Sequence, residues 1–311
     1  MKTHFLDRSV TTSRWDNSLE PRIWIDPGDR IVMETRDASD GQVHPGMSSR
    51  EFGSIDKTRI HGLTGPVGVR GAEPGDTLEV VINGFTHEGW AWTSIIPGLG
   101  LLDDAFDEPC LHIWKLEDGH TESMPGTRLI LQPFAGIIGV QRAEPGAFRT
   151  RPPGPWGGNM DVRHLTAGAR LFLPVQTDGA GLCTGDCHAA QGDGEVSING
   201  MEAPMTVDYT LHLHKGKPLS GPYAITPGQQ VPEVYTRGSW LTFIESDEEP
   251  RQAAKRIVLR AMETIVERTG VSPQQACILC SVVLDLKLSQ VVNTPMTTVS
   301  GYLPEAIFKS G

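Results

Sequence analysis

The chain has 311 residues and a formal net charge of −11, and 38% of its residues are hydrophobic. Because an acidic surface repels phosphate backbones, nucleic acid is excluded as an expected partner. The N-terminal stretch MKTHFLDRS contains no apolar run, and no run of about 18 apolar residues occurs elsewhere, so we expect neither a secretory signal nor a membrane span.

Glycine and proline are abundant, with 35 and 23 residues, and so many turn formers predict numerous short strands. One local pattern recurs: a Pro/Gly or Ala/Gly turn is followed by alternating or β-branched apolar residues. Such turns lie at 25–29, 72–76 and 165–168, and a shortened version lies at 143–146. The pattern favours similar hairpin entries in one β-fold, and a duplicated β-unit is the alternative.

The sequence changes character near Glu245. Residues 248–268 place apolar side chains near one face at helical spacing, which predicts an amphipathic helix with Gly270 as its C-cap. Ser272, followed by proline, predicts the N-cap of a second helix. We therefore expect an α+β chain with a mainly β body, barrel-like or sandwich-like, over residues 1–245. A helical hairpin and C-terminal segment over 246–311 would pack on this body as one functional unit.

The densest group of chemically active side chains lies at residues 185–195, with the sequence GDCHAAQGDGE. Asp186 and His188 are two positions apart, so on a strand they face the same side. Carboxylate and imidazole ligands together suit Zn²⁺ or a similar divalent ion. Asp193 and Glu195 follow among small residues, which let a ligand approach the backbone closely. The alternative is a Gly-rich surface hairpin whose acids are merely solvated.

A second polar motif, GGNMD, occupies residues 157–161 after a Pro-rich loop. Its two glycines can offer backbone N–H groups to an anion, while Asn159 and Asp161 add an amide and a carboxylate. Because these residue types also form Asx turns and helix N-caps, both interpretations stay open. His61 precedes a Gly/Pro turn, where a single histidine is commonly a structural hydrogen-bonding residue.

The cysteines number five and are scattered, which indicates reduced thiols and a cytoplasmic location. Cys277 and Cys280 lie within an apolar helical run without a second cysteine pair, so we interpret them as core thiols. Cys187 lies between Asp186 and His188 and is expected to point to the opposite face of a strand. A nucleophilic Cys187 is the alternative, although no base is spaced for it.

Two motifs are long enough to carry a family resemblance. GDCHAAQGDGEV at 185–196 and GGNMDVRHLTAGARLFLPV at 157–175 strongly resemble signatures of the acetamidase/formamidase family. Segments 37–42, 63–80, 133–146 and 285–308 resemble further blocks of that family, in the same order. The loop at 149–156 and Cys187 fall at positions that vary in the family, and the loop is expected to tune substrate choice.

The resemblance implies a mainly β fold with a helical C-terminal portion. It also implies hydrolysis of formamide, acetamide or a related short amide to a carboxylic acid and ammonia. Because the family includes enzymes that open lactam rings, hydrolysis of a γ-lactam is the first alternative. A small-molecule-binding relative without catalytic activity is the second.

We place the roles that amide hydrolysis requires on these motifs. The expected cofactor is a divalent metal ion, with zinc as the first choice, and its predicted ligands are Asp161, Asp186, His188 and His61. Glu195 is the predicted general base, and Asp193 would orient Glu195 or the substrate. The residues predicted to contact the substrate or its oxyanion are Asn159, Gly158 and Gln191. A metal-free enzyme that uses Cys187 is the competing mechanism, and we expect a homo-oligomer.

Overall fold

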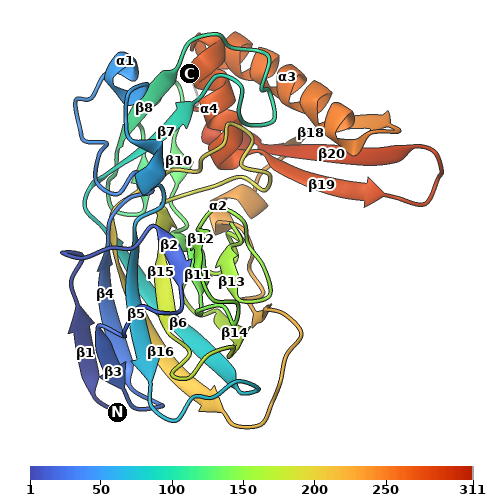
Figure 1. Cartoon of the computed structure of the whole chain (residues 1–311). Coiled ribbons are helices and arrows are strands. Elements are labelled where there is room, and N and C mark those ends of the chain that lie inside the picture. Colours follow the sequence, from blue (N-terminus) through green and yellow to red (C-terminus); the bar gives the residue numbers. More distant parts are fainter. Residues whose placement is uncertain (310–311) are drawn as a thin grey trace.

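The computed structural model describes residues 1–309 and consists mainly of β-strands. Figure 1 shows the strands as an elongated body, with two long helices lying together across one of its ends. The predicted class, mainly β with a helical C-terminal portion, is confirmed. None of the helices in the described part of the chain is both long and apolar enough to cross a membrane.

Two large sheets build the body. The first has six strands in the order β1 (Thr3–Leu6), β4 (Arg30–Thr35), β16 (Met205–His214), β6 (Thr77–His87), β14 (Arg170–Pro174) and β17 (Tyr223–Ile225). The second has five strands in the order β13 (Gly157–Asn159), β11 (Phe134–Gly139), β15 (Leu182–His188), β5 (Leu63–Val69) and β3 (Ile23–Ile25). Four of the nine predicted site residues, Gly158, Asn159, Asp186 and His188, lie on strands of this second sheet.

The two sheets share one hydrophobic core. On β16, Val207, Tyr209 and Leu211 are fully buried, while the polar residues between them face outward, as the two-residue period of a strand requires. The Tyr209 hydroxyl lies 3.2 Å from the Thr184 hydroxyl of β15, so the two sheets are in direct contact. The predicted sandwich-like body therefore describes this arrangement.

The recurrent turn pattern marks real strand entries. β4 follows the turn at 25–29, β6 follows the turn at 72–76, and β14 follows the turn at 165–168. All three strands lie in the six-stranded sheet, where β6 and β14 are direct neighbours. The shortened turn at 143–146 leads into β12 (Ala147–Arg149). The turns are therefore similar entries into one sheet and a short neighbouring strand.

Smaller sheets and short helices complete the part of the chain before β18 and near its end. The two-stranded sheets pair β7 (Trp90–Ile95) with β8 (Cys110–Lys115), β9 (His120–Thr121) with β10 (Leu129–Ile130), and β2 (Arg14–Asp16) with β12. The short helices are α1 (Ser49–Phe52), η1 (Lys57–Arg59), α2 (Glu233–Thr236) and η2 (Glu305–Ile307).

The C-terminal portion contains the two predicted helices, α3 (Pro250–Thr269) and α4 (Pro273–Val283). Gly270 adopts a φ of 71° at the end of α3, and the Ser272 side chain caps α4, as predicted. A third sheet in the order β18 (Trp240–Asp247), β20 (Thr297–Pro304) and β19 (Asp285–Gln290) was not predicted. Because β18 begins before Glu245 and pairs with β20, the two predicted regions are joined by this sheet.

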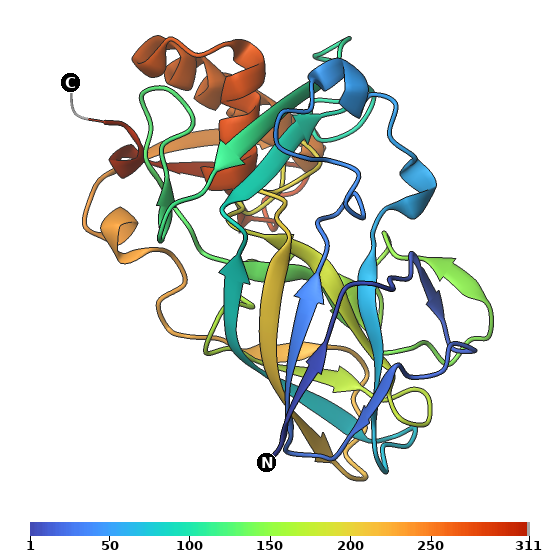
Figure 2. The same ribbon diagram turned by 90° about the vertical axis from the view of Figure 1, so that its left-hand side faces the viewer.

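Figure 2, turned by 90°, shows the helices seated across the end of the body near β7 and β8. α4 is buried from Ala276 to Val283, where it packs between α3 and these strands. Cys277 and Cys280 face this core, with at most 2% of their surface exposed, which agrees with their interpretation as core thiols. All five cysteines are free in the described residues.

Candidate metal centre and active site

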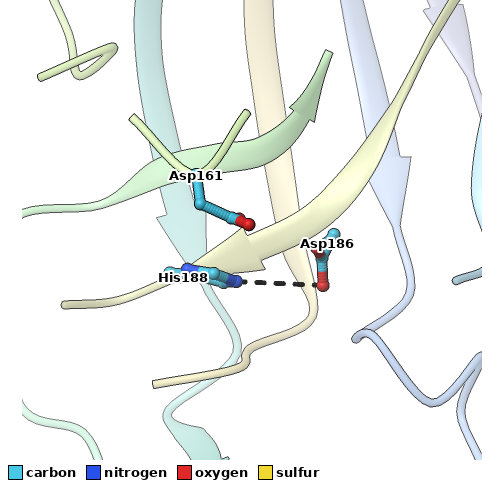
Figure 3. Close-up of side chains that lie close together, drawn as sticks. All are labelled: Asp161, Asp186 and His188. Carbon is cyan, nitrogen blue, oxygen red and sulfur yellow. Dashed lines mark ion pairs between the residues drawn. The ribbon is translucent and has the colours of Figure 1, made fainter. Parts of the chain in front are cut away.

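Three predicted ligands converge at the end of β15. His188 Nε2 lies 3.8 Å from Asp186 Oδ1, so these residues face the same side, as their spacing predicts. Asp161 follows β13 and reaches the same place over β11, as Figure 3 shows. A Cβ atom at Gly136 of β11 would lie 2.6 Å from Asp161 Oδ1, so only glycine leaves room for this carboxylate.

Further ionisable side chains border the three. His61 Nε2 lies 3.9 Å from Asp186 Oδ2. Glu195 Oε1 lies 4.0 Å and Glu202 Oε1 lies 3.1 Å from His188 Nε2. The side chains form two overlapping sets, and within each set the potential ligand atoms lie within 4.8 Å of one another. The first set is Asp161, Asp186 and His188, and the second is His188, Glu195 and Glu202. We call these five residues together with His61 the acidic cluster.

Glu202 was not predicted from the sequence. It lies 14 residues after His188, beyond a loop, and is placed by backbone pairing between the two ends of that loop. Ala189 N donates to Met201 O at 2.7 Å, and Ala203 N donates to Cys187 O at 2.8 Å. Only this return of the chain places Glu202 beside His188, and no spacing rule within a single strand reveals it.

Gln191 orients His188. Its Oε1 lies 2.7 Å from His188 Nδ1, and because an amide oxygen only accepts, Nδ1 carries the hydrogen. Its Nε2 donates to the Asp161 carbonyl at 3.0 Å, so both ends of the amide are used inside the site. Gln191 was predicted to contact the substrate. In the structure it lies beside the cluster, and its amide forms hydrogen bonds to two predicted metal ligands, His188 and Asp161. His188 Nε2 is directed at the carboxylates.

The backbone of the cluster is strained. Asp161, Asp186 and Glu195 adopt φ values of 50°, 53° and 46°, which residues other than glycine rarely do. Each such conformation costs about 1–3 kcal/mol and is retained where the surrounding structure fixes it, commonly at functional sites. Three strained carboxylates around one histidine favour a functional interpretation over a solvated surface hairpin.

Burial and the neighbouring charges shift the pKa values of the cluster in different directions. Burial raises the pKa of Glu202 to about 8 and the pKa of Asp161 to about 7, and it raises the pKa of Glu195 well above the usual value. Burial alone would lower the pKa of His188, but the carboxylates of Glu202 and Asp186 raise it well above its usual value. The carboxylates thus favour a positive charge at the position of the imidazole.

The donor atoms of the cluster fit a divalent metal ion. His188 Nε2, Asp161 Oδ1 and Glu202 Oε2 are buried without a hydrogen-bond partner in the described residues. Unpaired buried polar atoms are costly, and a bound cation would satisfy all of them. Neutral imidazole nitrogen and carboxylate oxygen are ligands that zinc accepts, and the Gln191 bond to Nδ1 leaves Nε2 available.

The remaining predicted site residues make contacts outside the cluster. Gly158 is paired with Ile138 in the sheet, and Asn159 donates to the Arg151 carbonyl at 3.1 Å through one of its amide hydrogens. The carboxylate of Asp193 lies 3.7 Å from Arg163 Nε and 4.0 Å from His164 Nε2. Asp193 is thus placed beside Arg163 and is not among the ligand atoms of the cluster.

Cys187 is fully buried in the core that the two sheets share. Its Sγ accepts a hydrogen bond from the Thr35 hydroxyl at 3.5 Å. Burial raises the pKa of its thiol to about 12. A thiol with this pKa is almost entirely protonated at neutral pH, and the thiolate is the nucleophile, so the geometry disfavours the metal-free mechanism.

We expect Cys187→Ala to retain most of the wild-type turnover, because its sulfur packs in the core and not among the cluster carboxylates. The measurement is kcat with a short amide, with circular dichroism as the control for folding. A loss of more than about a hundredfold in kcat, equal to about 2.7 kcal/mol of barrier, in a folded variant would restore Cys187 as the nucleophile.

Comparison with known proteins decides the family. A sequence profile of the Acetamidase/Formamidase family matches residues 2–146 and 140–310. The chain belongs to the acetamidase/formamidase family. The resemblance inferred from the GGNMD and HAAQGDGE motifs is therefore confirmed, as is the prediction of an enzyme that hydrolyses amides.

Individual relatives match most of the chain. A formamidase of Methylophilus methylotrophus is 27% identical over 371 aligned positions, which cover 96% of this chain and 89% of that protein. Among solved structures, a gamma lactamase from Delftia acidovorans is 26% identical, covers 100% of this chain and 94% of its own, and gives a TM-score of 0.91. An acetamidase from Bacillus halodurans is 31% identical, covers 96% of this chain and 97% of its own, and gives 0.68.

Proposed function

We propose that the protein hydrolyses a short carboxamide of the formamide or acetamide kind to a carboxylic acid and ammonia, with help from a divalent metal ion. The observation that supports this most directly is the acidic cluster, a buried set of strained carboxylates around His188 in a chain of this family. Amide hydrolysis needs activated water, a polarised carbonyl and a protonated leaving nitrogen, and the residues present divide these tasks.

Asp161, Asp186 and His188 are the proposed ligands, with His61 as a fourth and Glu202 as an addition from the structure. A divalent ion bound there would lower the pKa of water and polarise the amide carbonyl. Gln191 keeps Nδ1 of His188 protonated, so that Nε2 presents its lone pair to the cluster. Zinc is the proposed ion because the ligands combine imidazole with carboxylates.

Glu195 is the proposed general base. Its raised pKa lets it take a proton from the attacking water and return that proton to the departing nitrogen, which leaves as ammonia. Asn159 has a second amide hydrogen that is not used toward Arg151, and we assign this hydrogen and Gly158 to the oxyanion. Asp193 is proposed to support the backbone near Glu195, because its carboxylate lies toward Arg163.

A γ-lactam is the second candidate substrate. The observation that favours it is the much closer superposition on the Delftia gamma lactamase than on the Bacillus acetamidase, although the sequence identities are similar. A five-membered lactam presents the same amide bond as a linear amide, so the same residues serve. For this substrate the nitrogen stays attached to the product, and no ammonia is released.

The substrate panel is a direct test. We expect ammonia release from at least one of formamide, acetamide and propionamide, or ring opening of a γ-lactam, and no cleavage of peptides. The assay measures ammonia and the new carboxylate in parallel, with the protein supplied with Zn²⁺. Absence of turnover across this panel would contradict the enzymatic proposal and favour a binding protein.

A cytoplasmic location and assembly into a homo-oligomer complete the proposal. The scattered free cysteines support the first. An acidic enzyme of this size commonly self-associates, which supports the second. Fractionation of the cells and light scattering of the purified protein measure these two properties.

A further inference from the structure

The loop that carries Gln191 and Glu195 is held by the C-terminal portion of the chain. Gly192 N donates to the Ser281 carbonyl of α4 at 2.9 Å, and Leu286 N of β19 donates to the Asp193 carbonyl at 2.8 Å. Asp193 N donates to Asp285 Oδ1 at 3.1 Å. These contacts fix the backbone of Gly192 and Asp193, just before Glu195. The N–H of Glu195 itself donates to the Gly192 carbonyl at 3.1 Å.

Arg163 joins these contacts at one point. Its Nη1 donates to the Gln191 carbonyl at 3.0 Å and to Asp285 Oδ1 at 2.5 Å, while Nη2 donates to Asp285 Oδ2 at 3.0 Å. Only 7% of Arg163 and 2% of Asp285 is exposed, so this two-pronged ion pair is shielded from water. Burial raises the pKa of Asp285, and the charge of Arg163 partly offsets that rise.

We propose that Arg163 is a positioning residue for hydrolysis, an inference that rests on the proposed function. Through the Gln191 carbonyl it fixes the residue whose side chain orients His188. Through Asp285 it fixes the backbone of Asp193, which lies two residues before Glu195. It acts on the reaction only through these residues.

The role requires a guanidinium. The planar guanidinium of arginine donates hydrogen bonds to both oxygens of Asp285 and to the Gln191 carbonyl at the same time. A lysine ammonium is a single point charge and does not reproduce this geometry. Arg163, Gln191 and Asp285 also line a small cavity of about 20 Å³. Truncation of Arg163 enlarges this cavity, so a free guanidinium ion has a place to bind between the same acceptors.

The matched control is Arg170. Its Nε lies 2.6 Å from Oε1 of Glu79, a carboxylate that is 3% exposed, so Arg170 also pairs with a buried carboxylate, although its own side chain is exposed. Arg170→Lys is expected to leave kcat and KM unchanged. Any general effect of replacing an arginine that pairs with a buried carboxylate appears in this variant as well.

The test measures kcat, KM and bound metal for Arg163→Lys and Arg163→Ala on the amide that the wild type hydrolyses best. We expect kcat to fall about tenfold in Arg163→Lys and about a hundredfold in Arg163→Ala, because small misplacements of catalytic groups have effects of this size. With Zn²⁺ supplied in excess, so that a weakened metal affinity does not empty the site, KM and metal content should stay near wild-type values. Millimolar guanidinium chloride should restore part of kcat in Arg163→Ala, and none in Glu195→Gln.

Four outcomes overturn the inference. They are a wild-type kcat in Arg163→Lys, an equal loss in Arg170→Lys, a loss of metal that parallels the loss of kcat, and failure of guanidinium to restore a folded Arg163→Ala. Should Arg163→Ala not fold, the kcat, KM and metal content of Arg163→Lys decide. If the wild type hydrolyses no amide or lactam, the proposed function fails as well. If the wild type is active, Glu195→Gln is inactive and Arg163→Lys has a wild-type kcat, then the proposed function stands and only the positioning role of Arg163 is refuted.

Discussion

Replacement of His188 by alanine is expected to remove both the bound metal and the turnover. His188 is fully buried, its Nε2 faces the carboxylates, and it belongs to both sets of potential ligands. Without the imidazole, the carboxylates lose the nitrogen donor and repel one another. We expect kcat/KM to fall on the order of a thousandfold, equal to about 4 kcal/mol of barrier. Elemental analysis of the purified variant, beside kcat/KM, makes the measurement.

Two further variants serve as comparisons for His188→Ala, one with a smaller expected effect and one with none. Gln191→Ala leaves the imidazole but removes the acceptor of Nδ1, and such supporting contacts typically contribute 10–100-fold in metal affinity. His214→Ala removes a histidine whose Nε2 lies 2.6 Å from Glu79 Oε2 in the six-stranded sheet, so it should keep both metal and activity. If His188→Ala binds metal as tightly as the wild type, the metal centre is not at the acidic cluster.

Glu195→Gln is expected to keep the metal and lose turnover. Glutamine preserves the size of the side chain but cannot take a proton, so kcat should fall on the order of 10²–10⁴-fold. The backbone of Glu195 is fixed independently of its charge, by the bond from its N–H to the Gly192 carbonyl. Substrate binding should therefore change little, and kcat at saturating amide with parallel metal analysis separates the two effects.

Glu202→Gln is the comparison for Glu195, because both carboxylates lie within 4.0 Å of His188 Nε2. Glu202 is 2% exposed and its Oε1 accepts the Gly200 N–H at 3.0 Å, an arrangement that suits a ligand more than a proton carrier. We expect Glu202→Gln to lose metal. Should Glu195→Gln be purified without metal while Glu202→Gln stays loaded, the roles of the two glutamates are exchanged.

The sequence predicted those parts of the fold that depend on local pattern. Turn residues followed by alternating apolar residues gave the entries of β4, β6 and β14. Ser272 and Gly270 marked helix ends because capping depends on neighbouring residues. The sheet of β18, β20 and β19 was missed. On one side its central strand, β20, pairs with β18, which lies at least 50 positions earlier, and pairing at that distance leaves no local signal.

The candidate site shows the same division. Asp186 and His188 were placed on one side by the period of a strand, and the structure brings them together with Asp161 and His61. Glu202 joins only because the loop closes back on β15. The ion pair between Arg163 and Asp285 joins residues that are 122 positions apart in the sequence. The spacing of residues within one motif does not reveal such a contact.

The anchoring of the Glu195 loop by α4 and β19 has a consequence for the order in which the protein assembles. All strands of the two large sheets precede β18 in the chain, but the loop gains its bonds to Ser281, Asp285 and Leu286 only when the last quarter of the chain docks. Contacts between such distant positions form slowly, since the intervening chain must first be ordered. During refolding, the recovery of catalysis should therefore lag behind the recovery of β-structure. A molecule that has its sheets but not its C-terminal helices would hold the carboxylates of the centre without the geometry to use them.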